Sequence, residues 1–89
     1  MPKFVIEREV PGAGKLTDVD LKALARKSNG VLEGMPRVQW LESFVTDNKI
    51  YCVYIAPNVE ALKEHARCGQ FPADAISQVR NIIGPTTAE

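Results

Sequence analysis

The chain has 89 residues, enough for one domain with a modest core, and we expect that domain to span residues 1–89 with a tail from about residue 85. Its 11 basic and 11 acidic side chains cancel, so no positive field exists to attract a phosphate backbone, and nucleic acid is not an expected partner. The first residues are charged too soon for a signal peptide, and no apolar run has the length of a membrane span, so neither a leader nor a membrane partner is expected.

The first predicted element is a strand over Lys3–Glu9, followed by a loop over Pro11–Lys15. That loop resembles a phosphate-binding loop superficially. The phosphate-loop pattern needs Gly where this chain has Glu9, and Ser or Thr where it has Leu16. A nucleotide cofactor is therefore not expected.

A first helix is predicted to begin after Thr17, a good N-cap residue, with Asp20 completing a pattern like a capping box. Asn29-Gly30 is a typical helix stop, so we expect the helix to end at about Asn29. Spacings of three and four predict its buried stripe, made of Leu21, Leu24, Ala25 and Ser28.

Two apolar runs, Arg37–Asn48 and Lys49–Ala56, are predicted to form a hairpin with a tight turn at Asp47-Asn48. Strict alternation then gives two apolar faces. One face would carry Leu41, Val45, Ile50, Cys52 and Tyr54, and the other Val38, Trp40, Phe44, Tyr51, Val53 and Ile55. A sheet with one wet side should alternate apolar with polar residues, so both faces of this hairpin need cover. The chain has helices for one face, and we expect a second copy to cover the other.

The rest of the chain predicts a helix over Val59–Cys68 capped by Asn58, and then a last strand over Gln78–Ile83, with continuation of a helix as the alternative. The element order is βαββαβ. With right-handed crossovers this order gives an α+β, ferredoxin-like fold, in which an antiparallel four-stranded sheet carries both helices on one face. Two such sheets packed face to face form a dimeric α/β barrel.

His65 is the one histidine of the chain, and helical geometry places it at the edge of the second helix's apolar stripe. From there the ring can face a cavity between helix and sheet. One imidazole is a borderline ligand for nickel, copper or zinc if carboxylates or a thiolate complete the site. A histidine bonded to a backbone carbonyl on the helix flank is the alternative.

Glu42 lies between Trp40 and Phe44 on a strand face that is otherwise apolar. An ionised carboxylate there is costly unless it is paired, so we expect Glu42 to have a partner, to be protonated or to lie at a barrel rim. Such a group suits a metal ligand, and Glu7 on the first strand is the other carboxylate candidate. A salt bridge across a dimer seam is the alternative for Glu42.

Cys52 and Ser43 are predicted cross-strand neighbours on the face that carries Tyr54. With His65 and Trp40 these residues are the candidate lining of a ligand pocket. Cys52 and His65 would also form a loose nucleophile–base pair. The alternative is that these side chains are core and interface.

Five segments taken together resemble a known family: Trp40–Val45, Cys52–Pro57, Glu64–Ala66, Gly69 and Phe71–Ala73. The chain is similar, from Phe4 to Val79, to a small bacterial family of unknown function that includes a nickel-binding ferredoxin-like protein. The resemblance implies the βαββαβ fold, a homodimer, and nickel or another divalent transition metal as the cofactor. His65 and the strand of Cys52 and Tyr54 match the family pattern, whereas Glu7 and Glu42 are added on physical grounds.

Three functions remain open. The first is a small homodimeric cytoplasmic protein that binds nickel, another transition metal or a small ligand without turnover. The second is a cofactor-free barrel enzyme, an isomerase or oxygenase that acts on a small apolar substrate with His65 as its acid–base group. The third is a non-catalytic interaction or regulatory module. The cytoplasm is expected because Cys52 and Cys68 form no CxxC pair and predict free thiols.

Overall fold

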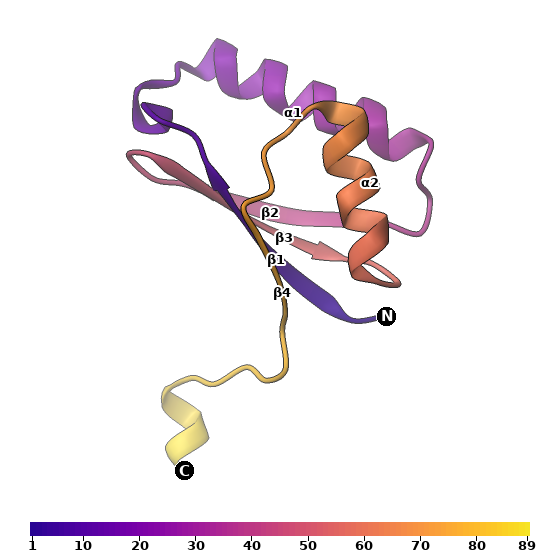
Figure 1. Cartoon of the computed structure of the whole chain (residues 1–89). Coiled ribbons are helices and arrows are strands. Elements are labelled where there is room, and N and C mark those ends of the chain that lie inside the picture. Colours follow the sequence, from indigo (N-terminus) through magenta and orange to yellow (C-terminus); the bar gives the residue numbers. More distant parts are fainter.

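Two helices lie on one side of a four-stranded antiparallel sheet in the computed structural model, which describes residues 1–89 (Figure 1). The elements are β1 (Lys3–Glu9), α1 (Asp18–Glu33), β2 (Gln39–Val45), β3 (Lys49–Ile55), α2 (Val59–Gly69) and β4 (Ala75–Gln78), with short 3₁₀ helices at Ala13–Lys15 and Pro85–Ala88. The strand order is β2-β3-β1-β4. This is the ferredoxin-like βαββαβ arrangement, so the predicted fold class is confirmed.

The core lies between the sheet and the two helices. Alternate residues of β1, namely Phe4, Ile6 and Arg8, point to the helix side and are buried, as period-two geometry requires. Leu62 of α2 closes over them and is 0 % exposed. We call this side of the sheet the inner face and the opposite side the outer face.

Helix α1 begins as predicted but ends later. The Asp20 amide donates to the Thr17 hydroxyl at 3.2 Å, and the Asp20 carboxylate accepts from the Thr17 amide at 3.0 Å, which confirms the capping box. The predicted end at about Asn29 is wrong, because the helix continues to Glu33. Gly30 sits on the exposed side, and the additional turn packs Leu32 against the core, which outweighs the weak helix propensity of glycine.

The β2–β3 hairpin has the predicted tight turn at Asp47-Asn48, where the Thr46 amide donates to the Lys49 carbonyl at 2.9 Å. Its register changes further along, because Glu42 pairs with Val53 but Trp40 pairs with Tyr54. Leu41 is thus the extra residue of a β-bulge.

The bulge corrects three predicted orientations. Trp40 and Val38 were expected on the outer face, but the extra residue turns both to the inner face. Val38 is 7 % exposed and belongs to the core. Leu41 was expected on the inner face, and it is exposed instead.

Helix α2 has the predicted Asn58 cap, whose side chain accepts from the Ala61 amide at 2.9 Å. The predicted strand over Gln78–Ile83 is wrong, since β4 spans Ala75–Gln78. The reason is the length of its partner. β4 runs antiparallel to β1, and by Val79 it has reached Lys3, the first residue of β1, so the chain beyond has no strand to pair with.

After Val79 the chain leads away from the helices, and its last residues form an exposed 3₁₀ helix apart from the sheet (Figure 1). The radius of gyration is 13.8 Å, compared with roughly 12 Å for a compact chain of this length. The tail begins earlier than the predicted residue 85, because the sheet ends at residue 78.

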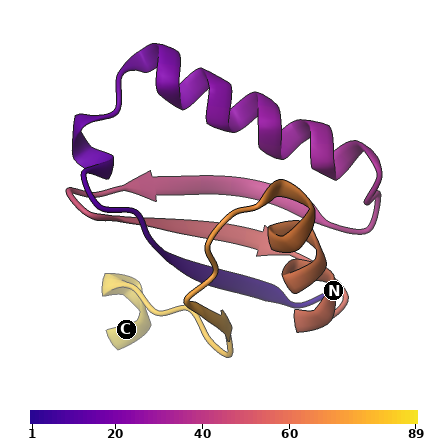
Figure 2. The same cartoon turned by 45° about the horizontal axis from the view of Figure 1, so that its top comes forward.

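The outer face carries no helix, as both views show (Figure 2). Its apolar side chains are half-buried or exposed, and they are Val5, Phe44, Tyr51, Val53 and Ile55. Phe44 is the most open of them at 54 % exposed. Neither helix has the length and apolar character needed to cross a membrane.

Candidate functional site

A cavity of about 260 Å³ lies between α1 and the inner face of the sheet. Its α1 wall is the predicted buried stripe of that helix, and its floor comes from β1, β2 and β3. The lining residues are Arg8, Leu21, Leu24, Ala25, Ser28, Trp40, Ser43, Val45, Ile50, Cys52, Tyr54 and Phe71. Most of this lining is apolar, with a few polar groups placed among the hydrophobic side chains.

Four of the five predicted pocket residues line this cavity: Trp40, Ser43, Cys52 and Tyr54. The bulge brings Trp40 to this side, where its indole Nε1 donates to the Ser43 hydroxyl at 2.9 Å. Cys52 and Ser43 are paired across the strands as predicted. The fifth residue, His65, lies behind the wall and is not part of the lining.

His65 is 0 % exposed, and its Nε2 lies 3.3 Å from the Ser28 hydroxyl. The rings of Tyr54 and Phe71 pack beside it at centroid distances of 5.3 and 5.5 Å. Its Nδ1 is sealed and has no hydrogen-bond partner. Burial, helped by the positive charge of Arg8, lowers the pKa of His65 to about 4, so the ring is neutral at physiological pH.

The predicted nucleophile–base pair is not formed. The Cys52 sulfur accepts from Arg8 Nε at 3.4 Å, and His65 bonds to Ser28 instead. A neutral imidazole that is sealed behind Ser28 also has no direct path to a bound molecule.

Arg8 is the site residue that sequence reasoning missed. It lines the cavity, is 4 % exposed, and donates through Nη1 to the Pro72 carbonyl. The signal was present in the sequence, because Phe4, Ile6 and Arg8 share one face of β1 at period two. An arginine on the same strand face as two core residues is either buried with them or directs its side chain to solvent at the end of the strand.

Gly69 and Phe71 shape the wall next to Arg8. A Cβ on Gly69 would lie 2.2 Å from the Phe71 ring, so the ring reaches its position because residue 69 is glycine. The guanidinium of Arg8 lies 5.4 Å from the Phe71 centroid, and Lys27 Nζ lies 4.8 Å from it. Two cations thus approach one aromatic ring, a favourable electrostatic arrangement.

Tyr54 adds a hydroxyl to the lining. Burial, together with nearby Cys52, raises the pKa of Tyr54, while Arg8 and Ser28 act in the opposite direction. The phenol therefore stays protonated at neutral pH and is available as a hydrogen-bond donor.

The predicted metal ligands do not meet within one chain. His65 is on the helix side of the sheet, whereas Glu7 and Glu42 project from the outer face. Glu42 was expected to have a partner, to be protonated or to lie at a barrel rim, and in the chain it is exposed and forms no ion pair. No three His, Cys, Asp or Glu side chains form a cluster able to hold a metal ion.

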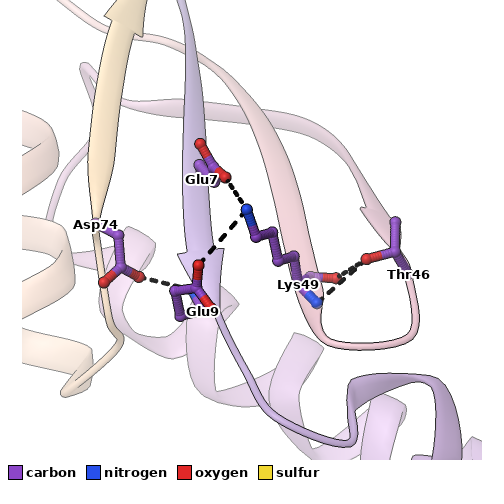
Figure 3. Close-up of polar contacts among 5 residues, drawn as sticks. All are labelled: Glu7, Glu9, Thr46, Lys49 and Asp74. Atoms are coloured by element: carbon purple, nitrogen blue, oxygen red, sulfur yellow. Dashed lines mark hydrogen bonds and ion pairs between the residues drawn. The ribbon is translucent and has the colours of Figure 1, made fainter.

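Glu7 already has a counter-charge (Figure 3). Its carboxylate lies 2.6 Å from Lys49 Nζ, which also lies 3.5 Å from Glu9. Glu7 raises the pKa of Lys49, and the lysine remains charged. The neighbouring Asp74 carboxylate accepts from the Glu9 amide at 2.6 Å.

Cys68 and Glu64 of α2 are near His65 in sequence but lie on the exposed side of the helix. The hydrogen bond to Glu64 raises the pKa of the Cys68 thiol. The donors of a single chain therefore do not fit a nickel ion.

The fold and the cavity define a ferredoxin-like α+β protein with a ligand-sized space between its helices and its sheet. Residues 4–79 match the family described as nickel responsive protein SCO4226-like, and the chain belongs to this family. The crystal structure of SCO4226 from Streptomyces coelicolor A3(2) is similar, with 19 % identity, a TM-score of 0.77, and coverage of 91 % of this chain and 99 % of that one. None of the curated proteins matches significantly.

Proposed function

We propose that this protein is a homodimeric binding protein that holds a small, largely apolar ligand in the cavity under α1 without turning it over. The cavity supports this proposal. Protein interiors rarely keep voids much larger than a water molecule. An apolar space of about 260 Å³ with a few polar groups in its wall is typical of a small ligand site.

Binding without turnover is favoured because His65, the acid–base group of the enzyme alternative, is not among the lining residues. No carboxylate lines the cavity, and the neutral His65 lies behind Ser28. These observations argue against the isomerase or oxygenase alternative, which relied on His65 to move a proton.

Trp40 is the one tryptophan of the chain and lines the cavity, so its fluorescence reports on occupancy. We expect hexanamide, a neutral apolar probe, to change Trp40 fluorescence saturably. Ala25→Phe should abolish the change by filling the cavity, since Ala25 is part of the lining. Ala23→Phe adds the same volume on the exposed side of α1 and should leave binding intact. A titration that does not saturate, or equal binding by the two variants, would contradict the proposal.

The homodimer is supported by the outer face. A row of half-buried apolar side chains across β1, β2 and β3 has no cover within the chain. An uncovered apolar surface of this kind can be buried against the same surface of a second copy related by a two-fold axis. Sedimentation at micromolar concentration should give a dimer, and Val53→Glu should give a folded single-copy species. A wild-type protein that sediments as a monomer would overturn the proposed homodimer.

Nickel binding is the second candidate, and the description of the family favours it. Because one chain does not gather enough donors, a nickel ion would need donors from two copies. Glu42 is the unpaired carboxylate on the face where copies would meet. In a calorimetric nickel titration we expect Glu42→Gln to weaken binding and His65→Ala to leave it unchanged. Loss of binding in His65→Ala alone would contradict this arrangement.

The cytoplasm remains the proposed location. The two cysteines support it, since Cys52 is buried, Cys68 is exposed, and both are free.

A further inference from the structure

Arg8 carries a buried positive charge with no negative partner in the chain. It is 4 % exposed, and the ion pairs of the molecule involve Lys49 and Arg67 instead. Buried charges are normally paired, because removal from water is costly unless an opposite charge replaces the lost hydration. An arginine left unpaired inside a small protein therefore points to a partner that the chain does not supply.

The donors of Arg8 are only partly used. Of the five guanidinium N–H groups, Nε donates to the Cys52 sulfur, a weak acceptor, and Nη1 donates to the Pro72 carbonyl. The Tyr54 phenol is a further hydrogen-bond partner of Arg8, so the chain supplies three partners, none of them a carboxylate, for the five donors. The open space that Arg8 lines is the cavity.

We propose that the ligand of this cavity is a monocarboxylate with a short apolar body, and that Arg8 binds its carboxylate. This inference rests on the proposed ligand-binding function and names the chemical class of the ligand. The planar guanidinium matches the two oxygens of a carboxylate. The hydroxyls of Ser28 on α1 and of Tyr54 on β3 also line the cavity and add further hydrogen-bonding groups.

The rest of the cavity suits the apolar body. Leu21, Leu24 and Ala25 of α1 form one wall, and Ile50 and Trp40 belong to the sheet side. Since a water molecule takes up ~30 Å³ in the liquid, the cavity has room for about nine non-hydrogen atoms. A short aliphatic or a simple aromatic acid fits this space.

The charge of the wall argues for a single carboxylate. Arg8 is the one cation in the lining, and Lys27 approaches Phe71 without being a lining residue. A phosphate ester, which carries up to two negative charges, would leave its second charge unpaired in an apolar space.

The test compares hexanoate with hexanamide, which have the same number of non-hydrogen atoms and differ in charge. Binding to the full-length wild-type protein is followed by Trp40 fluorescence at pH 7. We expect hexanoate to bind at least about tenfold more tightly than hexanamide, because charge-assisted hydrogen bonds are roughly twice as strong as neutral ones.

Two variants complete the test. Arg8→Met should remove the preference for hexanoate or reverse it, since the charge is lost while most of the side-chain volume is kept. Lys27→Met is the matched control, because it removes a cation beside the same Phe71 ring but outside the lining. It should leave the preference unchanged.

The outcomes separate the two proposals. Equal binding of the two probes, or tighter binding of hexanamide, to the wild-type protein would overturn the carboxylate assignment and leave the binding function in place. Saturable binding of neither probe would overturn both. If Arg8→Met does not fold, the wild-type comparison alone decides.

Discussion

The inner and outer faces of the sheet share the same strands but differ in what they bury. The inner face is closed by α1 and α2, and it contains Arg8, His65 and the cavity. The outer face has no cover, and its ion pair, between Glu7 and Lys49, is open to water. Buried polar groups thus mark the candidate ligand site, while uncovered apolar groups mark the candidate assembly surface.

The largest expected difference between the faces is in packing. Leu62→Ala removes a fully buried side chain from the inner side and should lower the free energy of unfolding by about 2–5 kcal/mol. Val53→Ala on the outer face should cost about 1 kcal/mol or less in a dilute single-copy sample, because Val53 is only half-buried. Urea unfolding followed by circular dichroism measures both. A loss at Val53 as large as that at Leu62 would mean that the outer face is covered too.

The second expected effect is a pH dependence of the inner face. The pKa of His65 is lowered to about 4, against 6.5 for the exposed residue. As the pH falls from 6.5 towards 4, the unfolded chain takes up a proton that the folded chain does not, so stability is lost across this window. The loss is on the order of 3 kcal/mol, since each pKa unit is worth ~1.4 kcal/mol.

His65→Gln is the control for this loss, because the carboxylates titrate in both proteins and the histidine in one. The difference in unfolding free energy between the wild-type protein and His65→Gln should change with pH below pH 6.5 and become constant above it. A nuclear magnetic resonance titration of the single histidine gives the pKa of His65 in the folded chain directly. A measured pKa close to 6.5 in the folded chain would contradict the enclosed position of the ring.

A third, smaller effect tests the wall beside Arg8. Gly69→Ala places a methyl group against the Phe71 ring, which would have to move away from His65 and Arg8. We expect a loss of about 1–3 kcal/mol, as is typical of overpacking. Gly30→Ala is the matched substitution in α1, where a Cβ meets nothing, and it should stabilise the chain by about 0.5–1 kcal/mol. Stabilisation by both variants, measured by thermal unfolding, would contradict the close approach of Phe71.

The smallest effect is expected at the outer ion pair. Lys49→Met removes the partner of Glu7 and Glu9. Because exposed pairs contribute little and are screened by salt, the midpoint of thermal unfolding should change slightly at low salt and not at all at about 1 M salt. A large decrease in the unfolding midpoint that persists at high salt would show that this ion pair is shielded from solvent.

The sequence predicted the order of the elements well, because local signals specify them. The capping box at Thr17 and Asp20 and the turn at Asp47-Asn48 are short-range chemistry, and both are confirmed. The helix stop at Asn29 was wrong because the gain from packing Leu32 depends on the tertiary fold. The position of β4 depends on where β1 begins, which a local pattern does not contain.

The candidate site was predictable in part for a similar reason. Cys52, Tyr54 and Ser43 share a face by simple alternation from the turn. No glycine or proline near Leu41 signals the bulge in the sequence. Simple alternation therefore placed Trp40 on the wrong face. The three proposed metal ligands do not meet within one chain, because His65 lies on a helix that covers the inner face, whereas alternation places Glu7 and Glu42 on the outer face.

The bulge at Leu41 has a further consequence for how copies of this chain can meet. The bulge lies in β2, which is one edge strand of the sheet, and the other edge strand is β4, which has four residues. A bulged edge strand and a very short edge strand are both poor templates for the addition of a further strand. Side-by-side growth into fibrils through the edges of the sheet is thereby disfavoured, even though the outer face leaves apolar side chains uncovered.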